Sequence, residues 1–360
     1  MKLPRPSANI NEYRRIMMSG FERYPDRLNN YNKIQDLCES GYGEILDCMP
    51  IKMDYEVSNA CNFRCKMCLL SDPQSCTSPK IMRYDDFKKS VEQQWGLIEV
   101  KLQGLGEPLL NHDFFKMVDE CVKRDIWVRT VTNGSVLHVN DNYKKMIEKK
   151  IGEIQVSIDG AKKETFEYIR EGSDFEQVVA NVKMMNEYAA QNGREWSTSC
   201  WMLVQNDNFE EMEDVLDLAE YMGFTRMVYS ISVGDFGGIG NWKEINGKKN
   251  VGDRFTEAIG WNLVEKGKRK GIDVSFWDVD DKYKYNESRK EICDWLFTRS
   301  YISADMRIVP CCEISDPQIC DMGKALDFRN EWNNEKFREI RKSHINGNIP
   351  QMCRNCYDGI

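Results

Sequence analysis

The sequence predicts an α/β fold in which a partial (β/α)6 barrel of the TIM type is followed by a small C-terminal α+β domain. One observation is a run of about six strand–helix repeats between residues 51 and 270. Strands that alternate with helices form parallel sheets with right-handed crossovers. The other is a change of pattern near residue 290, since six of the 14 cysteines lie in the last 70 residues. We therefore divide the chain into a mostly helical N-terminal extension (1–50), a barrel (51–275) and a C-terminal domain (276–360).

Hydrophobic periodicity places the elements of the barrel. Ser173 and Glu176 fit a capping box, in which the two side chains satisfy backbone donors at the start of a helix. Gly193 and Gly223 follow two of the apolar helical patterns and mark where those helices end. Alternating or β-branched apolar residues predict strands at 52–57, 98–102, 126–132, 154–158, 197–204 and 225–231, and apolar residues at helical spacing predict helices at 114–122, 141–150, 175–193 and 212–222.

Two later segments depart from this rhythm. Residues 231–251 contain five glycines, which predicts a flexible loop at the carboxyl end of a strand. It is either an ordinary long connection or a lid over a substrate. In the C-terminal domain, strand-like runs at 296–303 and 306–311 precede one helix at about 331–343.

Charge and composition exclude several classes of protein. The net charge is −8 and the isoelectric point about 5.3, which disfavours nucleic acid as a partner. No apolar stretch approaches the 18 residues of a membrane span, and residues 1–15 lack the apolar core of a signal peptide. We therefore expect no membrane partner and a cytoplasmic location, where disulfides do not persist. The 14 cysteines then indicate metal ligation or redox chemistry.

The first cysteine cluster directly follows the first predicted strand. Cys61, Cys65 and Cys68 form a Cys-x3-Cys-x2-Cys motif. Three thiolates on one short loop can hold three irons of a [4Fe–4S] cube, which leaves the fourth iron open to a small molecule. The alternative is a zinc site in which Cys76 supplies the fourth ligand.

This motif resembles the cluster-binding loop of the radical S-adenosylmethionine (SAM) superfamily, although Met67 stands where that family usually has an aromatic residue. The sequence Gln103-Gly104-Leu105-Gly106-Glu107-Pro108 resembles the family's Gly-Gly-Glu motif. The resemblance implies that the open iron binds the amino and carboxylate groups of SAM. An electron from the cluster then cleaves a C–S bond, and the resulting 5′-deoxyadenosyl radical abstracts a hydrogen from the substrate.

The resemblance also implies a set of SAM contacts. Gly106, Glu107 and Pro108 would hold the amino group of SAM. Polar residues at the carboxyl ends of two later strands would touch its ribose or its carboxylate, unless they are turn residues that bond only to their own backbone. Arg170 resembles a family arginine near SAM, and an exposed arginine at a helix end is the alternative. The strand-end residues are Asn133, Ser157 and Asp159.

The C-terminal cysteines predict a second metal site. Two distant cysteines followed by Cys-x2-Cys can close a four-thiolate site, and the pattern resembles the SPASM/twitch extension of radical SAM enzymes. We assign Cys293, Cys311, Cys353 and Cys356 to one auxiliary [4Fe–4S] cluster. A structural zinc site is the alternative, because four thiolates suit both metals. Cys312 and Cys320 have no assigned role.

A cluster ligated by four thiolates has no open iron, so it can exchange electrons but cannot hold substrate. We therefore expect a radical SAM oxidoreductase that oxidises a small molecule, such as a sugar or another metabolite, with the auxiliary cluster as electron acceptor. A flavodoxin or ferredoxin would act as reductant. One alternative is a maturase that crosslinks, epimerises or oxidises a ribosomally made peptide, although only about 50 residues precede the barrel. Another is a non-enzymatic electron carrier or regulator.

Overall fold

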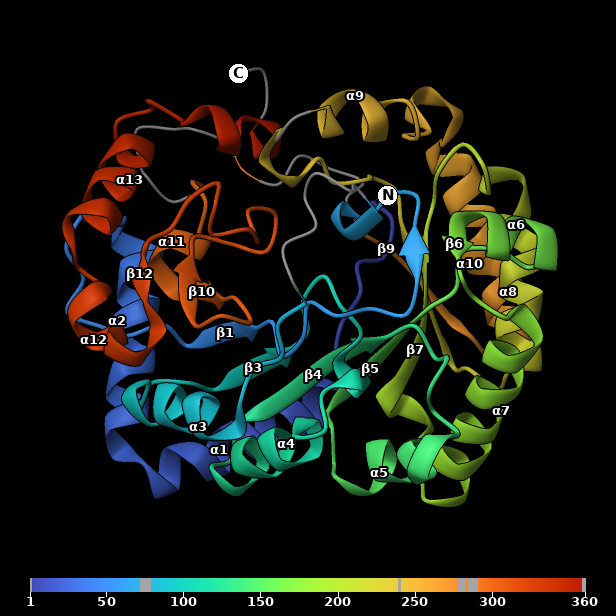
Figure 1. Cartoon of the computed structure of the whole chain (residues 1–360), viewed down its shortest axis with the longest axis horizontal. Helices are drawn as coiled ribbons and strands as arrows, with labels where there is room; N and C mark the ends of the chain where they lie inside the picture. The colour runs from blue at the N-terminus through green and yellow to red at the C-terminus, as the bar shows by residue number, and fades with distance from the viewer. Residues whose placement is uncertain (1, 72–78, 239–240, 278–282, 284–290, 358–360) are drawn as a thin grey trace.

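The computed structural model describes residues 2–71, 79–238, 241–277, 283 and 291–357. Its core is one ten-stranded sheet that curves into an open barrel (Figure 1). Neighbouring strands from β10 through β9 are parallel, and β11 and β12 add an antiparallel edge. In order across the sheet, the strands are β12 (Gly323–Lys324), β11 (Arg307–Val309), β10 (Arg299–Ile302), β1 (Lys52–Tyr55), β3 (Glu99–Leu102), β4 (Trp127–Thr132), β5 (Glu153–Ser157), β7 (Thr198–Leu203), β8 (Arg226–Ser230) and β9 (Asp273–Trp277). The expected partial barrel is confirmed.

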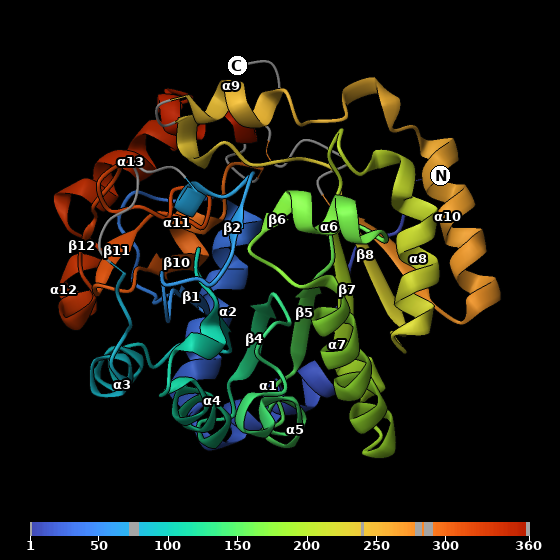
Figure 2. The same ribbon diagram turned by 45° about the vertical axis from the view of Figure 1, so that its right-hand side comes forward.

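Helices cover the outer, convex face of this sheet (Figures 1 and 2). Helix α4 buries one apolar stripe that includes Phe114, Val118 and Cys121, as an amphipathic helix on a sheet must. Along β3, Val100 and Leu102 are fully buried, whereas Lys101 between them is half-buried on the opposite, inner face. The helices are α1 (Ile10–Arg23), α2 (Pro25–Ser40), α3 (Tyr84–Gln93), α4 (Phe114–Lys123), α5 (Asn142–Glu148), α6 (Lys163–Ile169), α7 (Phe175–Gln191), α8 (Met212–Tyr221), α9 (Trp242–Gly247), α10 (Glu257–Lys270), α11 (Trp295–Thr298), α12 (Phe328–Glu331) and α13 (Glu335–Ile345).

The start of α7 differs from the sequence prediction by one residue. Asp174, not Ser173, is the N-cap, and its carboxylate accepts a hydrogen bond from the backbone N–H of Gln177. Asp and Ser cap helices about equally well, so the sequence pattern alone did not separate them. The predicted ends of two helices are confirmed, because Gly193 and Gly223 have φ angles of +64° and +80°.

The glycine-rich segment 231–251 contains a helix that we did not expect. Helix α9 lies within it, and Trp242 and Asn246 of this helix are buried. The apolar signal for a helix is only one and a half turns long here, and the surrounding glycines hide it.

The C-terminal segment continues the barrel sheet. Strand β10 pairs in parallel with β1, with Lys52 opposite Arg299 and Tyr55 opposite Ile302. The strand-like run at 296–303 begins as helix α11 and becomes extended only at Arg299. Strand β9 contains the predicted boundary between residues 275 and 276. The division into three domains stays a prediction.

The N-terminal helices close the end of the barrel at which the strands begin. The ring of Tyr13 on α1 packs edge-on against that of Trp127, the first residue of β4, at 5.4 Å. Arg27 on α2 donates to the backbone carbonyl of Arg124. The backbone carbonyl of Pro4 accepts from the N–H of Phe276 at 2.8 Å, so this segment covers the edge strand β9.

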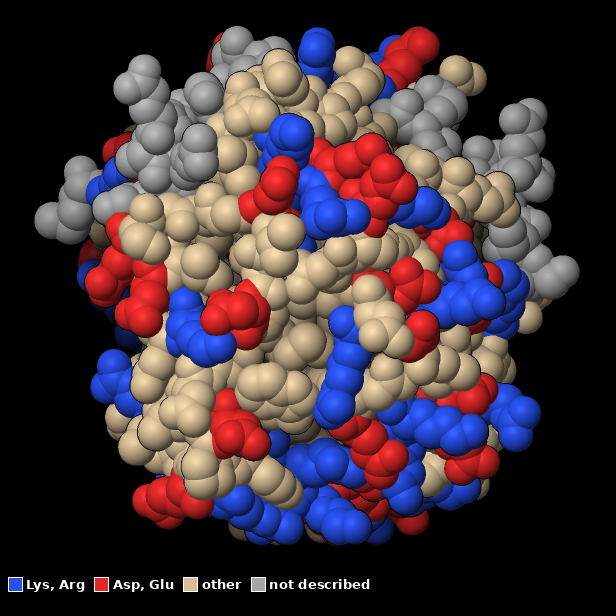
Figure 3. Space-filling view, turned by 90° about the vertical axis from the view of Figure 1, so that its left-hand side faces the viewer, with Lys and Arg blue, Asp and Glu red and all other residues tan. Residues whose placement is uncertain are grey.

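Acidic and basic side chains are interspersed over the side of the molecule shown in Figure 3. Ion pairs also join charged side chains of neighbouring helices and loops, such as Arg124 and Glu92 at 3.2 Å. Among the helices of the described residues, none has the length and apolarity that crossing a bilayer requires.

Candidate active site

The first cysteine loop extends from the carboxyl end of β1. Within it, the short strand β2 (Arg64–Cys65) pairs antiparallel with β6 (Arg170–Glu171), and Cys65 lies opposite Arg170. The backbone N–H of Cys68 donates to the carbonyl of Cys65 at 2.9 Å and closes a tight turn. This geometry brings together the three cysteines of the predicted cluster motif, Cys61, Cys65 and Cys68, all half-buried and reduced.

Burial keeps these thiols protonated in the absence of metal. It raises the pKa of Cys65 to about 11 and that of Cys68 to about 12, and it also raises the pKa of Cys61. Negative charge on Cys65 and Cys61 would raise the pKa of Cys68 further, because the three sulfurs are electrostatic neighbours. A metal that binds here must therefore displace protons, and its positive charge is what would stabilise three thiolates in so small a volume.

Two of the predicted SAM-binding residues bond directly to these sulfurs. Nη1 of Arg170 donates to Sγ of Cys65 at 3.9 Å, and Nη2 forms an ion pair with Asp159 at 2.6 Å. Asp159 also accepts from the backbone N–H of Leu203 at 2.8 Å and is completely buried. Asp159 therefore orients Arg170 against the cysteine loop. The alternative of an exposed arginine at a helix end is wrong, since Arg170 is buried. Asn133 provides the second contact, with Nδ2 4.0 Å from Sγ of Cys61.

The Gly106–Pro108 loop packs against the chain that leads into Cys61. A Cβ on Gly106 would lie 2.4 Å from the carbonyl oxygens of Ser58 and Ala60, so only glycine fits there. The backbone N–H groups of Gly106 and Glu107 donate to those same two carbonyls at 3.2 and 2.9 Å. Pro108 is buried and begins the 3-10 helix η2 (Pro108–Leu110).

Glu107 ties this loop to the end of β4. Its carboxylate accepts from the hydroxyl of Thr132 at 2.9 Å and from the backbone N–H groups of Asn133 and Leu109 at 2.8 and 3.2 Å. Burial raises the pKa of Glu107 to about 6 in spite of these donors. Ser157, the last residue of β5, is half-buried opposite Trp201 and makes no hydrogen bond to the other predicted contacts within the described residues.

Sequence reasoning missed Glu56, which joins the two cysteine-bearing parts of the chain. Its carboxylate accepts from the backbone N–H of Leu105 at 3.1 Å and from that of Ala304 at 3.0 Å. Burial raises its pKa to about 7. Glu56 directly follows β1, so a search for polar residues at every strand end would have found it.

The four C-terminal cysteines assigned to the auxiliary site lie in one region. Cys293 precedes α11, Cys311 follows β11, and Cys353 and Cys356 lie in the 3-10 helix η9 (Gln351–Cys356). Cys293 is an electrostatic neighbour of the other three, and burial raises its pKa and those of Cys311 and Cys353. Cys312 is a neighbour of Cys311 and Cys320 of Cys353. Cys76 lies outside the described residues.

Tyr357 fixes the relative position of these cysteines. Its hydroxyl accepts from the backbone N–H of Cys293 at 2.9 Å and lies 2.6 Å from Nδ1 of the buried His344. Because Tyr357 directly follows Cys356, these bonds join the two ends of the predicted ligand set. Burial lowers the pKa of His344 to about 4, which keeps its ring neutral.

Segments from both cysteine regions meet at the barrel mouth. Asn246 on α9 donates to the carbonyl of Met67 in the first cysteine loop at 3.3 Å. In the same glycine-rich segment, Asp235 accepts a hydrogen bond from Asn355, between the last two cysteines. A cavity of about 70 Å³ lies between the two regions, and its lining includes Glu56, Leu69, Leu105, Ser303, Asp305 and Ser315.

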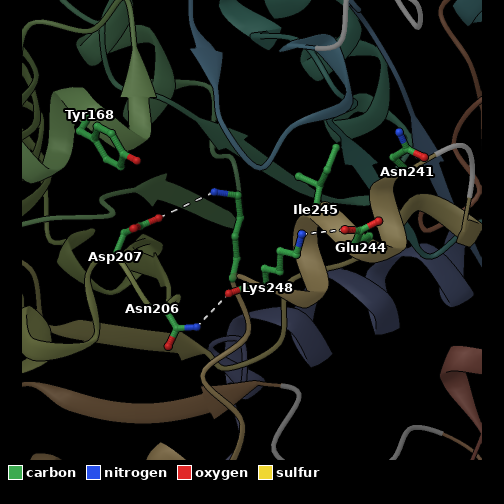
Figure 4. Close-up of a pocket in the computed structure, with 8 residues that line it drawn as sticks. Tyr168, Asn206, Asp207, Asn241, Glu244, Ile245 and Lys248 are labelled. Atoms are coloured by element: carbon green, nitrogen blue, oxygen red, sulfur yellow. Dashed lines mark hydrogen bonds and ion pairs between the residues drawn. The ribbon is translucent and has the colours of Figure 1, made fainter.

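A larger pocket of about 470 Å³ flanks the first cysteine loop (Figure 4). It lies between Tyr168 at the end of α6, Asn206 and Asp207 after β7, and helix α9. Lys66 of the cysteine loop stacks on the ring of Tyr168 at 3.2 Å, so the pocket and the loop share a wall. The charged groups in the pocket form ion pairs with one another, such as Lys248 with Glu244 at 2.6 Å.

The sequence of this chain is similar to a known family and to several characterised proteins. Residues 55–219 match the model of the radical SAM superfamily. A GTP 3',8-cyclase of Aliarcobacter butzleri is 26% identical over 313 residues, which cover 82% of this chain and 88% of the cyclase. The mycofactocin maturase MftC of Mycolicibacterium smegmatis is 24% identical over 232 residues, which cover 64% of this chain and 56% of the maturase.

Among solved structures, SuiB of Streptococcus suis bound to its precursor peptide SuiA has a similar fold. The TM-score is 0.63 at 14% sequence identity, and the match covers 88% of this chain and 71% of SuiB. The similarity thus extends well beyond residue 219, into the C-terminal segment that carries the second set of cysteines. Residues 55–219, which carry the cysteine loop and the strand-end motifs, therefore form a radical SAM domain.

Proposed function

We propose that this protein is a radical SAM enzyme that modifies a peptide or protein substrate and carries an auxiliary iron–sulfur cluster. The proposal favours the maturase alternative over the small-molecule oxidation that we expected from the sequence. Its support is the similarity to the maturase MftC and to SuiB, which was solved with its precursor peptide. The observation that carries it is that Asp235 and Asn246 bond to Asn355 and Met67, one in each cysteine region, next to a pocket of about 470 Å³.

The donor set at the first site fits a [4Fe–4S] cluster that binds SAM. Cys61, Cys65 and Cys68 would hold three irons and leave the fourth for SAM. When bound, this pair supplies a 5′-deoxyadenosyl radical that abstracts a hydrogen from the substrate. The chain itself holds the thiolates in place, orients Arg170 beside Cys65 through Asp159, and keeps the Gly106–Pro108 loop against the cysteines.

The spacing of the sulfurs favours a cube over a single zinc ion at both sites. A tetrahedral zinc ion with Zn–S bonds of about 2.3 Å places its sulfurs about 3.8 Å apart. Among the described residues, no three cysteine sulfurs lie within 4.8 Å of one another. A cube separates its thiolates further, because each binds a different iron. We therefore propose that Cys293, Cys311, Cys353 and Cys356 hold a second [4Fe–4S] cluster.

The pocket beside α9 suits the backbone of a peptide. Its lining offers the amide group of Asn241 and the hydroxyl of Tyr168, which can pair with peptide N–H and carbonyl groups. Asn206 already donates to the carbonyls of Lys248 and Asn250, and this holds the two sides of the pocket together. We propose that a peptide segment lies here while the residue to be modified enters the barrel.

A second candidate is radical chemistry on a small molecule. The observation that favours it is coverage: the match to the GTP 3',8-cyclase spans 82% of this chain, more than the 64% matched to MftC. In either case the auxiliary cluster would exchange electrons with the substrate radical. Oxidation is one of several outcomes, along with crosslinking, cyclisation and epimerisation.

Deuterium transfer separates the two candidates, and the substrate need not be identified first. Cells of the source organism are grown in deuterated medium, and their peptides and small molecules are separated. Each fraction is incubated without oxygen with reconstituted enzyme, SAM and dithionite, and 5′-deoxyadenosine is analysed by mass spectrometry. The proposal predicts deuterium in 5′-deoxyadenosine from the peptide fraction. Transfer only from the small-molecule fraction contradicts it. The C61A/C65A/C68A variant should give none.

A further inference from the structure

A row of charged side chains crosses the inner face of the barrel below its mouth. Asp54 on β1, Lys101 on β3 and Arg129 on β4 occupy the same register on neighbouring strands. All three are half-buried, so solvent reaches the inner face at this level. Lys101 lies one residue before the end of β3, and the Gly106–Pro108 loop follows that strand.

The other cations of this inner face have a carboxylate partner. Lys52 lies 2.9 Å and Arg129 3.2 Å from Glu99, and Arg129 also lies 2.6 Å from Glu153. Arg226 bonds to Glu153 at 3.2 Å, and Arg299 to Asp294 at 3.1 Å. In these pairs, each of the four cations has a carboxylate within ion-pair distance.

Lys101 is different. Within the part of the chain that the structure describes, no carboxylate oxygen lies within 4.0 Å of its ammonium group, and no hydrogen bond reaches it. Asp54, Cys312 and Glu153 are its acidic neighbours at longer range, and burial and Arg129 lower its pKa. This half-buried ammonium group therefore keeps its donors free of the protein's carboxylates, and an oxyanion that reaches it gains a charge-assisted hydrogen bond.

We propose that Lys101 binds an oxyanion of the substrate on the inner face of the barrel. This inference rests on the proposed function, in which the oxyanion is a carboxylate of the peptide, either an acidic side chain or the C-terminus. The same chemistry would hold a phosphate if the substrate were a small molecule. Bound at Lys101, the anion lies below the cysteine loop. The atoms next to it then point toward the mouth, where the radical would form.

Isothermal titration calorimetry tests this subsite. Each probe is titrated into reconstituted enzyme that already holds SAM. The probes are N-acetylglutamate N-methylamide, its glutamine analogue and tripolyphosphate. We compare wild type with K101M, with K101R, which keeps the charge, and with K116M, a matched lysine change on the outer face of α4. Wild type should bind the glutamate probe and not the glutamine probe. K101M should bind it about thirtyfold more weakly or worse, and K101R and K116M should retain binding.

The outcomes separate this inference from the proposed function. Equal binding of the glutamate probe by wild type and K101M, or no saturable binding of either anion to wild type, overturns the inference. Deuterium transfer from peptides would in that case still support the proposed function. Binding of tripolyphosphate alone, lost in K101M, supports the oxyanion subsite and contradicts a peptide substrate. Formation of 5′-deoxyadenosine by K101M without substrate shows that the variant is folded and loaded.

Discussion

Arg170 and Cys65 are partners in the short ribbon formed by β2 and β6, and Nη1 of Arg170 lies 3.9 Å from Sγ of Cys65. Asp159 holds the same guanidinium from its other side at 2.6 Å. An arginine keeps its charge at every physiological pH. The first cluster would therefore be reduced beside a fixed cation, which stabilises the added electron.

Replacing Arg170 should change the redox behaviour of the first cluster. We expect R170Q to retain that cluster and to shift its reduction potential to a more negative value, since the cation that stabilises the reduced state is lost. R170K should lie between R170Q and wild type, and R254Q, on an exposed arginine, should leave the potential unchanged. Redox titration monitored by electron paramagnetic resonance measures this. An intact cluster with the wild-type potential in R170Q would contradict the role of Arg170.

The packing of Gly106 predicts a strong effect from a single methyl group. In G106A the new Cβ would overlap the carbonyl oxygens of Ser58 and Ala60. The loop must then move away from the cysteines, and we expect loss of SAM binding, measured by equilibrium dialysis. G247A is the control, because nothing lies within 4 Å of a Cβ at that position. Wild-type SAM affinity in G106A would show that the loop does not form the SAM site.

The sequence predicted the barrel correctly, and it placed the three cysteines of the first loop close together, because both depend on local signals. Strand and helix periodicity, and the spacing of Cys61, Cys65 and Cys68, can be read without knowing distant neighbours. Residues whose role depends on long-range contacts were missed. Glu56 contacts Leu105 and Ala304, which lie 49 and 248 residues away.

The C-terminal segment illustrates the same limit. Its strand-like runs were visible in the sequence, but their partner was not. Strand β10 pairs with β1, which precedes it by about 250 residues, and no local pattern encodes that pairing. The role proposed for Lys101 could not be predicted from the sequence for a related reason. The alternation in β3 shows that it faces away from Val100, yet only the structure shows that its neighbours leave it without a carboxylate.

The raised pKa of Glu56 predicts a pH-dependent stability. In the unfolded chain this carboxyl titrates near 4.5, whereas in the folded protein burial raises its pKa to about 7, with Asp305 adding to the effect. Its contribution to stability is complete below pH 4.5. Between pH 4.5 and 7 the unfolded chain has lost this proton while the folded protein still keeps it, so the free energy of unfolding falls with pH, by roughly 3 kcal/mol in all at pH 8.

E56Q provides the comparison, since glutamine cannot ionise. Chemical unfolding of both proteins between pH 5 and 8 should show wild type losing stability relative to E56Q as the pH rises. A difference between the two proteins that stays constant over this range would contradict the raised pKa. E56Q should retain both clusters. The two proteins then differ only in the ionisable carboxyl at residue 56, and the comparison reports its protonation.

The most direct test of the account is the content of iron and acid-labile sulfide per chain after anaerobic reconstitution. We predict about eight of each for wild type and for C38A, whose thiol lies outside both sites, and about four of each for C61A/C65A/C68A and for C293A/C353A. About four irons in wild type, with zinc at the C-terminal cysteines, would contradict the auxiliary cluster. Loss of all iron in C293A/C353A alone would show that the two sites are not independent.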